Sequence, residues 1–220
     1  MLFPSQERGG FAASTVEPIR GVNRRLTPTF VIMTPQRLAP DPLPSLFDRP
    51  VGLIRSSTPL GRIELTSDGT SVTSLALERQ DELPHDGFHE CPLDVLVTAC
   101  EQIAEYFDGS RRSFDVPLSP VGTPFQLAVW TGLAGIGFGE AKTYGQLGHE
   151  IGSGPAGRAI GSAVRANRLP LFVPCHRVLA AGGRITGYTQ GSGVPTKQWL
   201  LEHEGIDYRP LVPPAALQLA

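Results

Sequence analysis

The sequence predicts an α+β protein: a small N-terminal antiparallel-sheet domain with a flanking helix, then a mostly helical C-terminal domain that contains a helix-turn-helix. Three observations predict this fold. Residues 51–77 alternate apolar and polar residues around short turns, as antiparallel strands do. Residues 93–107 carry an apolar stripe at helical spacing. From residue 123 onward, short segments open with helix-capping residues.

Composition divides the 220 residues into four parts. Residues 1–50 contain eight prolines and no sustained periodicity, which predicts a flexible Pro-rich extension. Residues 51–118 are the predicted α+β domain, residues 119–209 the helical domain, and residues 210–220 a tail. With 40% hydrophobic and 18% charged residues the chain can bury a core, which excludes a wholly disordered protein.

The N-terminal domain begins with a predicted meander of strands. A strand from Gly52 leads into a second over residues 62–66, and the turn 67–70 leads into a third over residues 72–77. Pro92 is predicted at the first position of the helix. The stripe of this helix consists of Leu93, Leu96, Val97, Cys100, Ile103, Ala104 and Phe107, and it stops at Asp108-Gly109. A short extended piece, 114–118, closes the domain.

The C-terminal domain opens with a capped helix, in which Thr123 precedes Pro124 at the first helical position. Phe125 and Trp130 are predicted in the core.

Two short helices joined by a glycine-containing turn follow. Thr143 caps the first, over residues 144–150, and the turn 152–155 leads to the second, over residues 156–166. This is the outline of a helix-turn-helix, although most helical hairpins bind no DNA. A closing helix is predicted over residues 196–204.

The second of these short helices is rich in small residues and carries Arg158 and Arg165. Gly157 and Gly161 each cost about 1 kcal/mol relative to alanine inside a helix. A slim helix can press on a groove about 6 Å wide, where an arginine can insert beside a base. Packing on a neighbouring helix explains the small residues equally well, and the sequence leaves both explanations open.

The formal net charge of -2 hides an uneven distribution. Residues 51–120 contain 12 acidic and 5 basic residues, whereas residues 121–220 contain 8 basic and 5 acidic ones. A polyanionic partner is therefore expected only at the C-terminal section. No run approaches the ~18 apolar residues of a membrane span, and the N-terminus lacks the apolar run of a signal peptide. We expect a cytoplasmic protein with no membrane partner, whose cysteines stay as thiols.

The chemistry is predicted at Cys175, which follows the apolar run 171–173 and precedes a histidine and an arginine. Positive neighbours lower the pKa of a thiol and favour the thiolate. Because adjacent side chains diverge, His176 would act on Cys175 through a turn or a bridging water. Glu202 or Glu204 is the candidate carboxylate that orients the histidine. The competing interpretation is that Cys175 is a small buried hydrophobe.

These residues belong to a longer ordered pattern. Pro174-Cys-His-Arg-Val178 is preceded by Asn167 and an Arg-Ala-Ile-Gly helix, and followed by Gly187-Tyr188 and Lys197-Gln-Trp-Leu-Leu. In this the chain resembles the O6-alkylguanine-DNA alkyltransferases, also called methylated-DNA-protein-cysteine methyltransferases. The resemblance runs over residues 122–204, and a weaker one covers residues 51–118.

The resemblance implies DNA repair by direct, irreversible transfer of an alkyl group from O6-alkylguanine in double-stranded DNA to Cys175. O4-methylthymine is a further candidate lesion. Each protein molecule would act once, as a monomer, on a nucleotide flipped out of the DNA duplex. It would need no cofactor and no metal, because the thiol itself accepts the alkyl group.

The resemblance also implies a role for each matching residue. His176 would be the water-mediated base, Glu204 would orient it, and Asn167 would brace the turn that carries Cys175. Tyr144 would help to rotate the nucleotide and donate a proton toward guanine N3. The other DNA-facing residues would be Arg158, which fills the space of the flipped base, Arg165 near the phosphates, and Ala159, Gly161 and Ser162. The substrate pocket would be formed by Val164, Pro170, Val178, Tyr188 and Thr189.

Three departures from the family pattern bear on substrate range and DNA affinity. Arg168 replaces the usual proline, the loop after Tyr188 is longer, and Gly148-His149 replaces small apolar residues. They leave room for a second interpretation, a non-catalytic alkyltransferase-like protein that senses lesions, although such proteins typically lack the cysteine. A Cys/His hydrolase is a third interpretation and rests on the dyad alone.

Two histidines and two cysteines of the N-terminal domain lie close together in the sequence, but their spacing is not a recognised pattern of zinc ligands. We interpret His85 and His89 as loop residues, Cys91 as a residue near the helix start and Cys100 as a core thiol.

Overall fold

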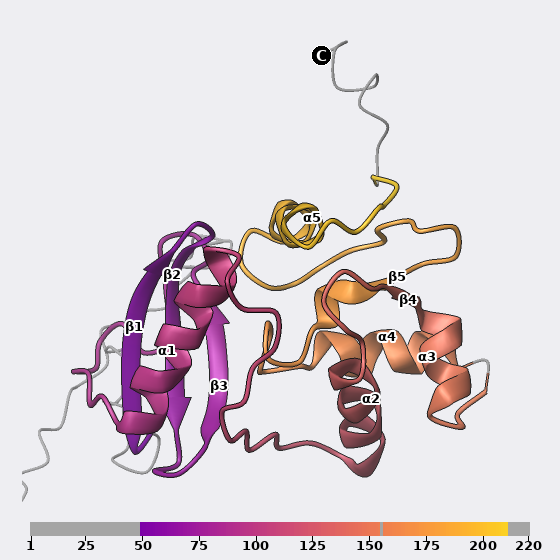
Figure 1. The fold of residues 1–220 in the computed structure, drawn as a ribbon. Coiled ribbons are helices and arrows are strands. Elements are labelled where there is room, and N and C mark those ends of the chain that lie inside the picture. The colour runs from indigo at the N-terminus through magenta and orange to yellow at the C-terminus, as the bar shows by residue number, and fades with distance from the viewer. Residues whose placement is uncertain (1–48, 155, 211–220) are drawn as a thin grey trace, which may run out of the picture. The chain divides into compact units, whose positions relative to one another are not determined.

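The computed structural model describes residues 49–154 and 156–210. The predicted extension up to residue 48 and the predicted tail after Pro210 lie outside the described residues. The strands are β1 (Gly52–Thr58), β2 (Gly61–Ser67), β3 (Val72–Leu77), β4 (Lys142–Thr143) and β5 (Val178–Leu179). The helices are α1 (Asp94–Phe107), α2 (Pro124–Ala134), α3 (Tyr144–Glu150), α4 (Gly157–Arg165) and α5 (Val194–His203), with a 3₁₀ helix over Cys175–Arg177. Figure 1 shows this order, which confirms the predicted α+β class.

The first three strands form the predicted antiparallel meander, in the order β1-β2-β3. Asp68 closes the turn between β2 and β3, because its carboxylate accepts hydrogen bonds from the backbone N–H groups of Thr70 and Ser71 at 2.9 Å each. The helix α1 lies across one face of this sheet (Figure 1). Apolar side chains from the helix and the sheet share one core cluster.

The predicted helix is present as α1, but its first residue and part of its buried face differ from the prediction. It begins at Asp94, so the prediction that Pro92 is the first helical residue is wrong. Val97, predicted in the stripe, is 40% exposed. The buried residues are Leu96, Ala99, Gln102, Ile103 and Tyr106. The two polar members of this set are tolerated there because each is hydrogen-bonded, to Asp115 and Glu204 respectively.

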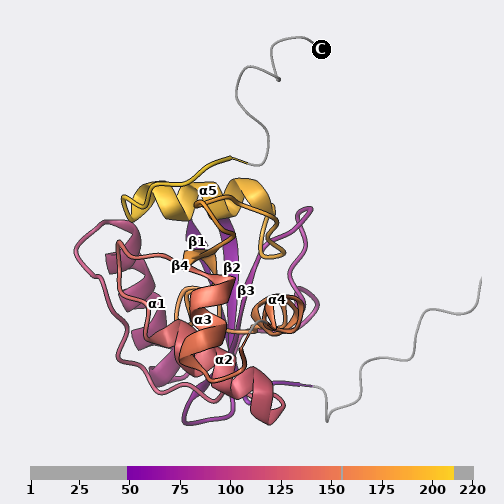
Figure 2. The same cartoon turned by 90° about the vertical axis from the view of Figure 1, so that its right-hand side faces the viewer.

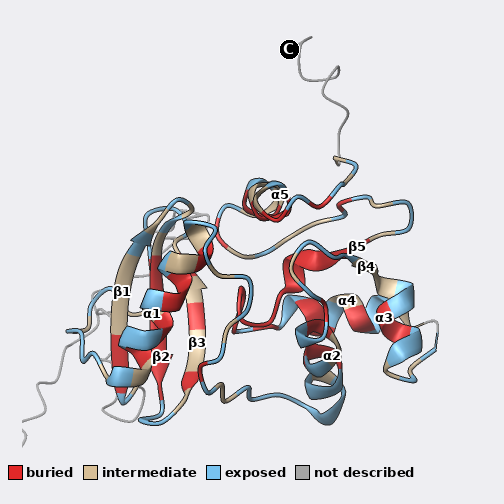
Figure 3. Cartoon of the chain, in the orientation of Figure 1, coloured by how far each residue is buried: buried red, intermediate tan, exposed pale blue. Residues whose placement is uncertain are grey.

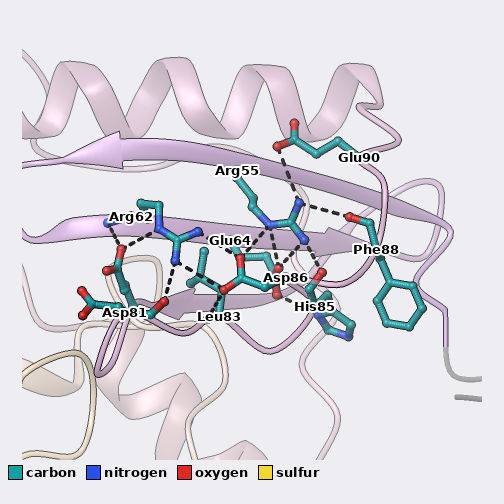
Figure 4. A network of polar contacts seen from close by, with 10 residues as sticks. Arg55, Arg62, Glu64, Asp81, Leu83, His85, Asp86, Phe88 and Glu90 are labelled. Carbon is teal, nitrogen blue, oxygen red and sulfur yellow. Dashed lines mark hydrogen bonds and ion pairs between the residues drawn. The ribbon is translucent and has the colours of Figure 1, made fainter. Parts of the chain in front are cut away.

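The other face of the sheet carries a network of charged side chains (Figure 4). The buried carboxylate of Glu64 accepts from Arg55 Nε at 3.1 Å and lies 2.7 Å from His85 Nδ1. Arg62 donates to Asp86 at 2.9 Å. These pairs fix the loop between β3 and α1 to the sheet, so His85 is a loop residue. Across the residues that the structure describes, no group of three His, Cys, Asp or Glu side chains could hold a metal ion.

The helix α2 opens with the predicted N-cap. Thr123 Oγ1 accepts from the Gln126 N–H, and the Gln126 side chain accepts in return from the Thr123 N–H at 2.8 Å. Trp130 is buried, as predicted, and donates from Nε1 to the Ala163 carbonyl at 2.9 Å, which joins α2 to α4. Phe125 is 37% exposed, so its predicted core position is wrong. The start of α2 is exposed in Figure 3, because this first turn extends past the core.

The helices α3 and α4 form the predicted helix pair and pack together against α2 (Figure 1, Figure 2). Thr143 caps α3 in a second reciprocal capping box, with Gln146. Gly148 permits the close approach of the two helices. A Cβ atom there would lie 2.5 Å from Ile160 Cδ1 and 2.8 Å from the Gly154 carbonyl oxygen. The unusual glycine at this position therefore has a packing reason.

The sheet and the helical part are joined along β3. The Leu75 N–H donates to the Arg168 carbonyl at 2.8 Å, so the segment after α4 is bonded to the outer edge of β3. The predicted extended piece ends at the same strand, where Leu118 forms a bridge with Val72. Among the described residues, no helix has both the length and the apolar character needed to cross a membrane.

Candidate active site

A cavity of about 490 Å³ opens between α3, α4, α5 and the loop that leads to α5. It brings together these predicted site residues: Tyr144, Arg158, Gly161, Ser162, Val164, Arg165, Cys175, Tyr188 and Thr189. The side chains of Pro170 and Val178 are buried and do not line it, which contradicts their predicted place in the pocket. Val178 instead lies in the core, because its strand pairs with β4. Ala159 is exposed and lies outside the lining.

Cys175 begins the 3₁₀ helix and is only 2% exposed. Its Sγ atom lies 3.5 Å from the Tyr188 hydroxyl. Burial raises the pKa of the Cys175 thiol, and the hydrogen bonds of Tyr188 and Asn167 offset only part of the rise. Lys197 also lowers this pKa, but burial outweighs it, so the predicted net lowering of the thiol pKa is wrong. In the free protein Cys175 is a thiol that needs a base.

Asn167 ties the end of α4 to the segment before Cys175. Its Nδ2 donates to the Val173 carbonyl at 2.8 Å, and its Oδ1 accepts from the Leu169 N–H at 2.9 Å. Between these two bonds lies Leu171, whose φ of +71° is rare for a residue other than glycine. Such a conformation costs on the order of 1–3 kcal/mol and persists where its surroundings fix it. Asn167 thus has the contacts expected of a brace for this turn.

Glu204 caps the C-terminal end of α5 and accepts hydrogen bonds from three side chains. Tyr106 Oη, His176 Nε2 and Arg177 Nη2 lie 2.8, 2.9 and 2.9 Å from Oε1, and Arg177 Nε lies 2.7 Å from Oε2. Burial favours the protonated acid, but the bonds from His176 and Arg177 outweigh it and lower the pKa of Glu204 to about 2. The carboxylate is therefore ionised and accepts at both oxygens.

The ionised Glu204 fixes the tautomer of His176. Because a carboxylate only accepts, the His176 Nε2 atom carries the proton and Nδ1 keeps the lone pair. Within the part of the chain that the structure describes, Nδ1 is buried and has no hydrogen-bond partner. Burial lowers the pKa of His176, and the contact with Glu204 opposes this only in part. His176 is thus a neutral imidazole whose Nδ1 atom can accept a proton.

Lys197 is a cavity residue that was not predicted. Its ammonium is buried, donates to the Val178 carbonyl at 2.5 Å and lies 5.8 Å from the centre of the Tyr188 ring. Burial lowers the pKa of Lys197 to about 8. The lysine is a positive charge next to the reactive thiol.

The outer face of α4 is exposed and has room for another molecule to come close to the helix backbone. Arg158 and Arg165 are exposed on it. A Cβ atom added at Gly157 or Gly161 would meet no atom within 4 Å. Packing against a neighbouring helix therefore does not explain these two glycines. Both line the cavity, beside Ser162.

Two family models match the sequence of this chain. Residues 53–120 match the ribonuclease-like domain of 6-O-methylguanine DNA methyltransferase, and residues 124–206 match its DNA-binding domain. This chain belongs to the 6-O-methylguanine DNA methyltransferase family. The resemblance inferred from the cysteine motif is thereby confirmed.

Relatives in this family match over almost their full length. The constitutive methylated-DNA–protein-cysteine methyltransferase of Bacillus subtilis is 40% identical over 160 residues, which are 70% of this chain and 95% of that protein. The methylated-DNA–protein-cysteine methyltransferase of Methanosarcina acetivorans is 47% identical over 151 residues, or 67% of this chain and 94% of that protein.

Solved structures give the same result. The crystal structure of Mycobacterium tuberculosis O6-methylguanine methyltransferase has a TM-score of 0.62 and 36% identity, covering 70% of this chain and 92% of that one. Mycobacterium tuberculosis OGT in complex with DNA has a TM-score of 0.61 and 37% identity, covering 68% and 90%. The α+β fold is thus that of known family members.

Two residues of the site, Tyr106 and Lys197, were missed from sequence, and Arg177 was predicted only as a positive neighbour of Cys175. The available signal for Arg177 was a charged residue in the largely apolar segment 169–179, whereas Lys197, between Thr196 and Gln198, had no such signal. Tyr106 had no local signal, because it lies 98 residues from Glu204 along the chain. Arg177 points at Glu204 and the Ile136 carbonyl, which is why it does not activate Cys175.

Proposed function

We propose that this chain repairs DNA by transferring a methyl or larger alkyl group from O6 of guanine to Sγ of Cys175. One observation supports this most directly. Cys175 lines the same cavity as α4, the arginine-bearing helix with open glycine positions, and the next residue, His176, is buried against Glu204. The named relatives are methylated-DNA–protein-cysteine methyltransferases, and one solved relative is in complex with DNA.

The proposed reaction starts with the Cys175 thiol proton, which His176 Nδ1 accepts through one water molecule. The sulfur then attacks the alkyl carbon, so an S–C bond forms as the C–O6 bond breaks. The electron pair of that bond stays on the guanine, which takes up one proton. Tyr144, whose pKa is raised mainly by burial, is protonated at neutral pH and is the proposed donor toward N3. The guanine gains as many protons as the thiol loses.

The product explains why each molecule should act once. A thioether offers water no easy leaving group, so Cys175 is not regenerated. Alkyl transfer is thus a single-turnover reaction that consumes the protein.

The alkylated nucleotide must leave the base stack to reach Cys175, at a cost of a few kcal/mol that is lowest for a poorly paired lesion. The cavity of about 490 Å³ lies in the usual size range for small-molecule sites. Arg158, exposed at its rim, is the proposed side chain that fills the gap in the duplex, while Arg165 is proposed near the phosphates. We propose double-stranded DNA carrying O6-alkylguanine as the partner, and a single copy of the chain, in the cytoplasm, as the active form.

Incubation with DNA carrying a labelled O6-methyl group tests the proposal. Label is expected on Cys175 at about one equivalent per protein molecule, with none after Cys175→Ala. The matched control is Cys100→Ala, which removes a half-buried thiol distant from the motif and should leave transfer unchanged. Label that stays on DNA bound tightly by the protein would instead favour the non-catalytic lesion sensor.

A further inference from the structure

Tyr106 belongs to the sheet domain, but its hydroxyl reaches the site in the helical domain. It extends from the last turn of α1, is 1% exposed, and donates to Glu204 Oε1 at 2.8 Å. The same oxygen lies 2.9 Å from His176 Nε2. Tyr106 therefore contacts the same Glu204 oxygen that holds His176, the proposed base.

The position of Tyr106 is set by contacts at both of its ends. The residue before Glu204 is His203, and its Nε2 atom is 2.8 Å from the Tyr106 carbonyl oxygen. The rings of Tyr106 and His203 meet edge to face, with centroids 4.9 Å apart. Phe114 and Phe138 also pack around the tyrosine ring. The last residue of α5 and the cap that follows it thus hold one residue of α1, so the hydroxyl has little freedom to leave Glu204.

We propose that Tyr106 is a positioning residue for alkyl transfer: its hydroxyl holds the Glu204 carboxylate in the orientation that keeps His176 Nδ1 free to accept the thiol proton. This inference rests on the proposed function. Arg177 holds the carboxylate through two nitrogens and His176 donates to it as well, and Tyr106 adds a fourth donor from another element. With both oxygens engaged, the carboxylate cannot rotate and the imidazole keeps one tautomer.

The hydroxyl also affects the basicity of His176. A hydrogen bond donated to a carboxylate disperses its charge, so the carboxylate attracts the imidazole proton less strongly. Loss of this bond should stabilise the protonated imidazole and raise the pKa of His176. The other charged groups that act on His176 are Arg177 and Lys197, both of which oppose its protonation.

The test compares Tyr106→Phe with Tyr208→Phe. The phenylalanine keeps the ring packing and removes only the hydroxyl. Tyr208 is the matched control, because its hydroxyl also donates to a glutamate, Glu202, at 2.6 Å, but on an exposed surface. Single-turnover transfer from labelled O6-methylguanine DNA is measured between pH 5 and pH 9 for both variants and the wild type, with thermal unfolding measured alongside.

Tyr106→Phe is expected to transfer roughly tenfold more slowly at neutral pH, and the acid limb of its pH profile should move to higher pH. Tyr208→Phe should match the wild type in rate and profile. An unchanged rate and profile for Tyr106→Phe would overturn the inference, and so would a slower rate with an unmoved profile, since that is the result of a purely structural role. A wild-type protein that transfers no label would overturn the proposed function as well.

Discussion

The Nε2 atom of His176 lies 2.9 Å from Oε1 of Glu204, and both side chains are fully buried. Taking a carboxylate out of water is costly unless donors surround it, and here three side chains supply them. The pair is therefore stable only while Glu204 is ionised and its donors are present. This makes both the stability of the protein and its chemistry depend on pH.

Acid should destabilise the protein through Glu204. Its pKa of about 2 lies below the ordinary 4.5, so the folded state binds the proton less readily than the unfolded state. Ionisation then contributes about 3 kcal/mol to the free energy of unfolding above pH 4.5, and this is lost as the pH falls toward 2. Chemical denaturation at a series of pH values measures the loss.

Glu204→Gln checks the same prediction at neutral pH. The variant leaves Arg177 buried without its counter-charge, which should cost about 3–5 kcal/mol. Its stability should also change less than that of the wild type between pH 4.5 and 2. Glu202→Gln, on the exposed face of the same helix, is the control. Parallel stability profiles for Glu204→Gln and the wild type would contradict the assignment.

Alkyl transfer should persist below the ordinary pKa of histidine. Since burial lowers the pKa of His176, the neutral imidazole survives into acid below pH 6.5, and so does its ability to take the thiol proton. The single-turnover rate is expected to stay level from pH 8 to 6.5 and to fall only at lower pH. A rate already halved at pH 7 would mean that another group, such as the Cys175 thiol, limits the reaction.

The fold was largely predictable because its signals are local. Strand alternation, the Thr123 and Thr143 caps and the glycine turn between α3 and α4 each act within a few residues, and each element formed as predicted. The errors arose where tertiary contacts decide burial. Phe125 lies on a helix turn that extends past the core, and the buried face of α1 includes Tyr106.

The site was predictable in part. The resemblance named Cys175, His176, Glu204 and Asn167. In the structure His176 contacts Glu204, Asn167 is bonded to the segment before Cys175, and Cys175 lies against Tyr188. The direction of the thiol pKa was not predictable, because it depends on burial and on where Arg177 points. The contact of Tyr106 with Glu204 follows only from the packing of α1 on α5.

Two glycines should respond oppositely to alanine. Gly148→Ala puts a Cβ atom 2.8 Å from the Gly154 carbonyl, so α3 and α4 must separate and the melting temperature should fall. Gly161→Ala meets open space, and alanine's helix propensity should stabilise the fold by up to about 1 kcal/mol. Gly161→Ala should nevertheless weaken DNA binding, because the added methyl group stands on the proposed contact face. Thermal unfolding and a DNA-binding titration separate the two effects. Equal destabilisation by both changes would contradict the packing described for α4.

Arg158→Ala should weaken binding to duplex DNA and reduce its dependence on salt. In the gap left by the flipped base, Arg158 would bring its positive charge close to the flanking phosphates, so its loss should lower the slope of log K against log salt concentration by about 0.9. Arg79→Ala is the matched control, since Arg79 is exposed in the acidic sheet domain, far along the chain from α4. It should leave the slope unchanged. Two results would mean that DNA does not bind at the face of α4. Either both variants reduce the slope equally, or neither variant reduces it.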